Sequence, residues 1–308
     1  MRWVRAEREH NGEERAKRKG YELTLPAFEL FRPATLDEAL QILADTPGAS
    51  PLGGGTCLLV DLRHRKRSVD ALVDLGRIEP LRDIRIEDAT LVLGAMTTIA
   101  DLLDSERVME HAPVLHAACK TFAAPLVRNR ATLGGNIAHA SPAADAAPPL
   151  LVLDAEIELQ SPAGMRRLRM ADFFLAPCQT ARANGELVTA IRIPMGNQVP
   201  SWGYEKIGLR KADAISVVSA AAVRTAETVR IALGAVAPVP IRARAAEERL
   251  GGGAWSTADI AEAARLAADE ARPIDDVRGT AAYRKRQAEI LVRRCLERVA
   301  EGGEARGA

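Results

Sequence analysis

Two glycine-dense segments of the chain combine residue types that can bind an anion. The first is Gly53-Gly54-Gly55-Thr56, and the second is Thr132-Leu133-Gly134-Gly135-Asn136. Glycine lets backbone amides approach a ligand closely and adopt positive φ at low steric cost. Successive amides in such turns form concave donor arrays that suit a pyrophosphate, and a following helix N-terminus adds partial positive charge. For either segment taken alone, a tight turn without a bound ligand is the commoner explanation.

Neither segment matches the better-known nucleotide motifs. The spacing G-x-G-x-x-G of the Rossmann site and the phosphate loop G-x-x-x-x-G-K-[ST] both differ from the glycine spacing found here. A nucleotide bound at these two segments therefore needs a different architecture.

The first glycine segment is expected at a strand-to-helix transition. A short strand at Pro51-Leu52 precedes it, and a helix follows Thr56. Upstream, the sequence from Thr35 to Glu38 predicts a capping box at the start of a helix, whose apolar residues over 36–43 share one face. A buried strand is predicted at 71–75, and the first lobe is expected to end shortly after it.

The second glycine segment, predicted as a turn, is expected in a lobe of mixed helices and strands. A hairpin is predicted from 84–86 and 91–93. Beyond residue 200 the composition changes and predicts a separate α+β domain. The further elements expected are helices near 98–105, 112–123 and 143–153, strands at 156–160, 165–170 and 186–193, a C-terminal strand pair at 216–223 and 229–236, and helices at 241–250, 257–271 and 280–300.

The second segment continues to Asp145 as Arg128-Asn-Arg-Ala-Thr-Leu-Gly-Gly-Asn-Ile-Ala-His-Ala-Ser-Pro-Ala-Ala-Asp145. This resembles the FAD-binding subunit of molybdenum hydroxylases, a family that includes the medium subunit of bacterial carbon monoxide dehydrogenase and the flavin domain of xanthine dehydrogenase. Members share A-T-x-G-G-N-(I/L)…S-P-x-x-D, preceded by (A/G)-G-G-T-D-L-L, and both occur here in that order. Similar stretches begin at Leu25, Tyr204 and Asp276, so the resemblance spans almost everything after residue 22.

The resemblance implies an α+β fold. A two-lobed vanillyl-alcohol-oxidase-like (PCMH-type) FAD-binding domain would occupy residues 22–200, with lobes at about 22–80 and 81–200. A C-terminal α+β domain of the carbon monoxide dehydrogenase flavoprotein type would follow at 201–308. Residues 1–21 are rich in Arg, Lys and Glu and are expected to form a charged extension.

By the same resemblance, FAD would lie in a cleft between the two lobes. Thr56 and Thr132 would donate hydroxyl hydrogen bonds to it, Asn136 an amide, and Asp145 would accept from adenosine hydroxyls. The residues expected to contact FAD are Leu52, Gly53, Gly54, Gly55, Thr56, Cys57, Leu58, Phe122, Thr132, Gly134, Gly135, Asn136, Asp145, Val188 and Lys206.

Three of these residues have an ordinary alternative. Phe122 corresponds to an aromatic residue beside the cofactor, but helix core is an equal explanation. Val188 corresponds to an aliphatic flavin contact, although a strand residue facing a core is commoner. Lys206 corresponds to a lysine near the carbonyl region of the flavin ring, where a cation would stabilise negative charge on the reduced ring, and a solvated lysine is the alternative.

One residue departs from the family pattern. The family commonly has Asp after Gly-Gly-Thr, whereas this chain has Cys57. A neutral thiol cannot accept hydrogen bonds as a carboxylate does, so the following helix is expected to be held differently. His139 lies in the second segment, but a flavin that only relays electrons needs no base, and no residue is predicted to be catalytic.

Composition and cysteine spacing limit the possible partners. The 42 Lys+Arg and 41 Asp+Glu give a formal charge of +1, which favours neither nucleic acid nor an anionic membrane. No window resembles a membrane span or a signal peptide, so a cytoplasmic location is expected. The four cysteines form no C-x-x-C pair, which argues against an iron–sulfur or zinc site in this chain.

The resemblance implies a division of labour between subunits. A large partner would carry the molybdenum cofactor and a small partner the 2Fe-2S clusters. Electrons would pass through those clusters to FAD on this chain and then to an external acceptor, in a dimer of heterotrimers. Two alternatives stay open: a stand-alone flavoprotein oxidoreductase of the same fold, and a scaffold subunit without flavin.

Overall fold

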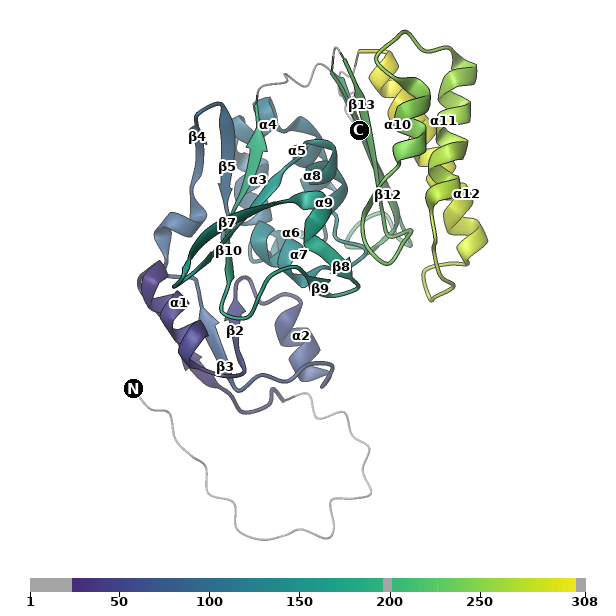
Figure 1. Cartoon of the computed structure of the whole chain (residues 1–308). Helices are drawn as coiled ribbons and strands as arrows, with labels where there is room; N and C mark the ends of the chain where they lie inside the picture. The colour runs from purple at the N-terminus through teal and green to yellow at the C-terminus, as the bar shows by residue number, and fades with distance from the viewer. Residues whose placement is uncertain (1–23, 196–200, 226, 303–308) are drawn as a thin grey trace, which may run out of the picture.

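The computed structural model describes residues 24–195, 201–225 and 227–302. The predicted charged extension at 1–21 lies outside these residues, as does most of the Gly/Asn/Pro-rich stretch that begins at 196. Within the described residues, none of the helices is long and apolar enough to cross a membrane. Figure 1 shows the three larger of the four sheets formed by the described residues following one another along the molecule, from the purple N-terminal part to the yellow C-terminal helices.

The first lobe consists of a small parallel sheet and two helices. Its elements are β1 (Glu29–Phe31), α1 (Leu36–Asp45), β2 (Ala49–Leu52), α2 (Leu58–Arg63) and β3 (Ala71–Asp74), with strand order β1-β3-β2. The predicted helix, strands and buried face are confirmed, because Ala39, Leu40 and Leu43 of α1 are buried.

The capping box predicted for α1 is half confirmed. The Thr35 hydroxyl accepts from the Glu38 backbone N–H at 3.2 Å, as expected. The Glu38 carboxylate, however, accepts from the N–H of Ala34 at 2.9 Å rather than from that of Thr35.

The second lobe is a five-stranded antiparallel sheet, order β4-β5-β10-β6-β7, covered by short helices. The long strand β10 is central and almost wholly buried. After a 3-10 helix at Glu79–Arg82, the elements are β4 (Ile84–Glu87), β5 (Thr90–Gly94), α3 (Ile99–Asp104), α4 (Glu106–His111), α5 (Pro113–Lys120), α6 (Pro125–Arg128), α7 (Leu133–His139), α8 (Ala147–Val152), β6 (Glu156–Ser161), β7 (Gly164–Arg169), α9 (Met170–Phe173), β8 (Phe174–Ala176), β9 (Gln179–Thr180) and β10 (Leu187–Pro194).

The predicted hairpin and the three later strands of this lobe are confirmed, whereas the helix α4 was not predicted from the sequence. The turn predicted at Thr132–Asn136 is wrong. Thr132 is the N-cap of α7, and its hydroxyl accepts from the Gly135 N–H at 3.1 Å, so both glycines lie in the first helical turn. A threonine hydroxyl at this position outweighs the low helix propensity of two adjacent glycines.

The C-terminal unit is a four-stranded antiparallel sheet with three helices on one face. Its elements are β11 (Ser201–Gly208), β12 (Ser216–Arg224), β13 (Val229–Gly234), β14 (Ile241–Arg242), α10 (Arg244–Leu250), α11 (Thr257–Glu270) and α12 (Ala281–Ala300). The strand pair and all three helices were predicted. The strands β11 and β14 were not, and β14 takes up the start of the first predicted helix.

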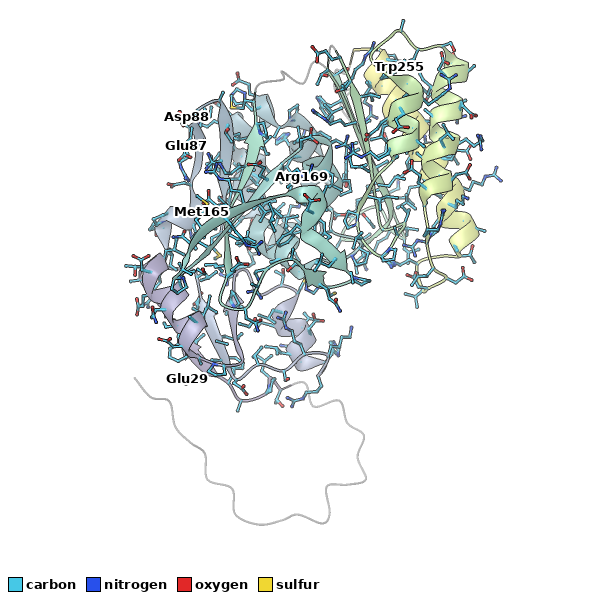
Figure 2. The ribbon with its side chains drawn as sticks, viewed as in Figure 1. Glu29, Glu87, Asp88, Met165, Arg169 and Trp255 are labelled. Atoms are coloured by element: carbon cyan, nitrogen blue, oxygen red, sulfur yellow. The ribbon has the colours of Figure 1, made fainter. Side chains whose placement is uncertain are left out.

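The C-terminal sheet is buried on both faces. Along β12, Ala220 and Ala222 pack with the three helices, while Ala221 and Val223 join the core of the second lobe. Ion pairs strengthen this junction, because Asp154 of the second lobe binds both Arg230 (2.7 Å) and Arg242 (2.9 Å). Figure 2 places Glu29 of the first lobe and Trp255 of the C-terminal unit at opposite ends of the molecule.

Candidate functional site

A cavity lies between the first and second lobes and contains about 950 Å³ of space, part of it open to solvent. Both glycine segments line it, so the structure brings together parts of the chain that are almost 80 residues apart in sequence. Twelve of the fifteen predicted site residues line this cavity: Gly53, Gly54, Gly55, Thr56, Cys57, Leu58, Phe122, Thr132, Gly134, Gly135, Asn136 and Val188.

The first glycine segment presents a run of unused backbone donors. Among the described residues, the N–H groups from Gly53 to Leu58 have no acceptor within the protein. Gly55 has φ +76°, a conformation that other residues rarely adopt. A row of unpaired amides along a cavity wall is a site for negatively charged oxygens.

The same segment is where the two lobes touch. A Cβ added to Gly54 would overlap the carbonyl oxygen of Arg130 and approach the Cα of Ala131 to 3.0 Å. A Cβ added to Gly53 would lie 2.9 Å from the Thr132 hydroxyl oxygen. Glycine is therefore needed here for close approach of the two backbones as well as for φ.

The second glycine segment has no unused donors at its helix start. The N–H of Leu133 donates to the Thr97 carbonyl (2.9 Å), that of Gly134 to the Ala95 carbonyl (2.9 Å), and that of Gly135 to the Thr132 hydroxyl (3.1 Å). The role of this segment is close packing, because a Cβ on Gly134 would clash with Ala95.

Asn136 contributes an unsatisfied polar atom to the cavity. Its Oδ1 is buried and makes no hydrogen bond with any described residue. A buried side-chain amide without a partner costs roughly 1–3 kcal/mol, so a ligand that supplies a complementary group would relieve that cost.

The cavity also has an apolar wall suited to a flat aromatic ring. Phe122 and Val188, 9% and 3% exposed, line it together with Met96 and Leu187. The pairing of β10 with β6 shifts register between Val188 and Ala190. Unpaired amides on one side and buried apolar side chains on another fit a molecule with both phosphates and an aromatic ring system, as FAD has.

Three predicted site residues do not line the cavity. Leu52 ends β2 and lies behind the glycine loop, where its carbonyl accepts from the Leu75 N–H at 3.1 Å. Asp145 and Lys206 are bound to each other instead, with 2.6 Å between the Lys206 Nζ and the Asp145 Oδ2. The structure therefore shows neither side chain directed into the cavity.

The Asp145–Lys206 pair joins the second lobe to the C-terminal sheet. The Ser216 hydroxyl donates to the Asp145 Oδ1 at 2.6 Å, and the Lys206 Nζ also donates to the Thr121 carbonyl at 3.1 Å. Burial raises the pKa of the Asp145 carboxyl, while the ammonium of Lys206 and the Ser216 hydroxyl oppose that shift. Since Thr121 directly precedes Phe122, the pair is bound to the backbone next to this cavity residue.

Cys57 is the N-cap residue of α2, and its side chain makes no capping hydrogen bond. This agrees with the expectation that a thiol, in place of the carboxylate common in the family, does not cap the helix. Burial raises the pKa of the Cys57 thiol above its usual value. The four cysteines are all free, and the described residues hold no group of three or more His, Cys, Asp and Glu that could bind a metal.

Eleven cavity residues were not predicted from the sequence. They include two arginines, Arg67 and Arg182, in loops of different lobes, and no local pattern marks either one. The eleven are Ser50, Pro51, Arg67, Leu75, Ala95, Met96, Ala131, Ala138, His139, Arg182 and Leu187.

Comparison with known proteins identifies two matching domain families. Residues 26–196 match the FAD-binding domain in molybdopterin dehydrogenases, and residues 204–299 match the C-terminal domain of the carbon monoxide dehydrogenase flavoprotein.

Individual relatives cover most of the chain. The carbon monoxide dehydrogenase medium chain of Hydrogenophaga pseudoflava is 36% identical over 276 residues, which span 88% of this chain and 96% of the relative. The xanthine dehydrogenase FAD-binding subunit of Escherichia coli O157:H7 is 35% identical over 224 residues, covering 70% and 77%. A chain in a solved structure of carbon monoxide dehydrogenase from Hydrogenophaga pseudoflava, in a form lacking the Mo-pyranopterin moiety, matches with a TM-score of 0.88 and 34% identity, covering 91% of this chain and all of that one.

Proposed function

The chain belongs to the FAD-binding medium subunits of the molybdenum hydroxylase family, and from that premise we propose that it is the electron-transfer subunit of its complex. It takes electrons from iron–sulfur clusters on a small partner subunit and passes them to an external acceptor. The observation that carries the proposal is the inter-lobe cavity, with unused amides on one wall and buried apolar side chains on another.

Within this cavity, the amides from Gly53 to Leu58 donate to the diphosphate of FAD. The hydroxyls of Thr56 and Thr132 and the unpaired amide of Asn136 complete the polar contacts. Phe122 and Val188 pack against the flavin ring and exclude water from that end. FAD, when bound, supplies the ability to accept and release one or two electrons.

Lys206 and Asp145 lie outside the cavity lining, where they bind each other. One oxygen of the Asp145 carboxylate binds Lys206 and the other accepts from the Ser216 hydroxyl. Asp145 could accept from adenosine hydroxyls, as predicted, only if the Asp145–Lys206 pair separated. Lys206 near the carbonyl region of the ring remains the simpler proposal, since its ammonium already lies beside the residue preceding Phe122.

The partners follow from the same reading. A large molybdenum-cofactor subunit and a small subunit with 2Fe-2S clusters would assemble with this chain as a dimer of heterotrimers in the cytoplasm. The substrate would then be determined by the large partner.

We also propose domain limits of 22–200 for the FAD-binding domain, with lobes at about 22–80 and 81–200, and 201–308 for the C-terminal domain. Of the four sheets that the described residues form, the three larger ones support this division, since each lies in a different one of these parts. The hydrophobic cluster of the first lobe nevertheless includes Met96 and Leu187 from the second, so the two lobes share part of a core.

The test is an absorbance spectrum of the chain purified with its neighbouring gene products, followed by acid release of flavin and a metal assay of each subunit. FAD on this chain, with molybdenum and iron on the partners, is expected. A colourless chain would favour the scaffold alternative. Substrate oxidation by the isolated flavin-loaded chain would favour a stand-alone oxidoreductase.

A further inference from the structure

We propose that Arg67 of the first lobe and Arg182 of the second lobe form a two-sided clamp on the diphosphate of bound FAD. Both side chains line the inter-lobe cavity, and neither belongs to the glycine motifs. The inference rests on the proposed function, because it takes the ligand of the cavity to be FAD.

Arg182 is held in place by the backbone of its own loop, between β9 and β10. Its Nη1 donates to the Glu186 carbonyl at 2.6 Å and to the Ala183 carbonyl at 3.4 Å. The Nε and Nη2 donors have no acceptor among the described residues. One edge of the guanidinium is thus anchored while the other edge is available to a ligand.

Arg67 belongs to the other lobe and lies in the loop between α2 and β3. It is exposed and makes no hydrogen bond or ion pair with any described residue, although it lines the cavity. An arginine side chain at a cavity mouth without a carboxylate partner has all five of its donors available.

The charges of the cavity favour an anion. Its lining contains these two arginines and no aspartate or glutamate. Burial lowers the pKa of Arg182 from its usual value, the positive charge of Arg67 lowers it further, and the Glu186 carboxylate opposes the shift. Burial also lowers the pKa of His139, with Asp61 opposing that shift and Arg67 adding to it.

Phosphate is the anion that fits these groups. Guanidinium binds phosphate oxygens through paired, charge-assisted hydrogen bonds, and the amides from Gly53 to Leu58 supply further donors on the adjoining wall. A diphosphate between two arginines would remove their mutual repulsion and would link the two lobes through the ligand.

The clamp is tested with ligands that differ in phosphate number. The flavin-free full-length chain and its variants Arg182→Ala, Arg182→Lys and Arg67→Ala are titrated with FAD, FMN and riboflavin by flavin fluorescence. Arg63→Ala is the matched control, because Arg63 is an exposed arginine on α2 that does not line the cavity.

We expect Arg182→Ala to raise the dissociation constant for FAD about tenfold or more, since charged hydrogen bonds are lost at a half-buried site. Arg182→Lys should lie between Arg182→Ala and the unsubstituted chain. Arg67→Ala should raise the dissociation constant for FAD roughly threefold, because the Arg67 side chain is exposed. Riboflavin affinity should change less than twofold in all variants, and the Arg63→Ala variant should match the unsubstituted chain with every ligand.

Equal losses for FAD and riboflavin would show that the arginines only maintain the loops, and the clamp would be wrong. Unchanged FAD affinity in both arginine variants would also reject it, while leaving the proposed function intact. If the unsubstituted chain binds no FAD, the proposed function and the clamp fail together. Because riboflavin lacks phosphate, its binding also reports whether a variant has kept its folded cavity.

Discussion

The two glycine segments have similar composition, line the same cavity and use glycine for different purposes. In the first, the amides from Gly53 to Leu58 have no acceptor in the part of the chain that the structure describes, and Gly55 has positive φ. In the second, the amides from Leu133 to Asn136 are all satisfied within the protein, and Gly134 is needed because Ala95 packs against it. A glycine pair in a sequence can therefore indicate either a row of free backbone N–H donors or a close contact between two backbone segments. The two cases are distinguished by whether the N–H groups have acceptors within the protein.

The largest effect is expected for Gly54→Ala. Its new methyl group would overlap the carbonyl oxygen of Arg130, which belongs to the backbone and cannot move aside easily. Overpacking of this kind costs up to about 3 kcal/mol, so the dissociation constant for FAD should rise roughly hundredfold as the lobes separate. Isothermal titration with FAD measures this, with Gly253→Ala as control because a Cβ there meets nothing within 4 Å. An unchanged FAD affinity of Gly54→Ala would mean that the two lobes shift to accept the added methyl group.

Gly134→Ala should affect stability rather than ligand binding. Alanine normally stabilises a helix by about 1 kcal/mol relative to glycine, but the clash with Ala95 outweighs that gain. The free energy of unfolding should fall by about 2 kcal/mol, while FAD affinity of the folded protein changes less than about threefold. Urea denaturation with a parallel FAD titration checks both. A selective loss of FAD affinity would contradict the distinction between the two segments.

Thr132→Ala should lower stability by about 1 kcal/mol, because it removes the cap of α7. The matched variant is Thr98→Ala, which removes the cap of α3 in the same lobe without altering the cavity lining. Thermal denaturation should give similar losses for the two variants, and only Thr132→Ala should weaken FAD. A fall in FAD affinity for both would assign the effect to lobe stability.

The smallest effect concerns the reactivity of Cys57 beside the first glycine segment. Cys57 is exposed, but desolvation by the protein atoms around its thiol raises the thiol pKa, so alkylation by iodoacetamide should accelerate with increasing pH. FAD should slow the alkylation by covering the cavity wall. Peptide mass spectrometry measures the rates, with Cys119 as an unreactive reference because burial raises its pKa to about 12. Rapid alkylation at pH 7 that FAD does not slow would place Cys57 outside the ligand site.

Much of the fold was predictable because its elements carry local signals. Apolar periodicity identified α1 and the strands of the second lobe, and turn residues marked the hairpins. The strand β11 was not predicted, because it is partly exposed and contains glycines and charged residues, which resemble a loop. Twelve of the fifteen predicted site residues line the cavity, since the family motifs preserve their order along the chain.

The sequence by itself determined the family, the FAD-binding role and the two glycine segments that line the cavity, because these depend on residue identity and order. Tertiary structure decided which amides stay unpaired, since the acceptors of the second segment, Ala95 and Thr97, lie far away along the chain. It likewise decided that Asp145 and Lys206, 61 residues apart, bind each other, and that Arg67 and Arg182 share one cavity. The partners of backbone and charged groups depend on which distant segments fold against them, and no local pattern encodes that.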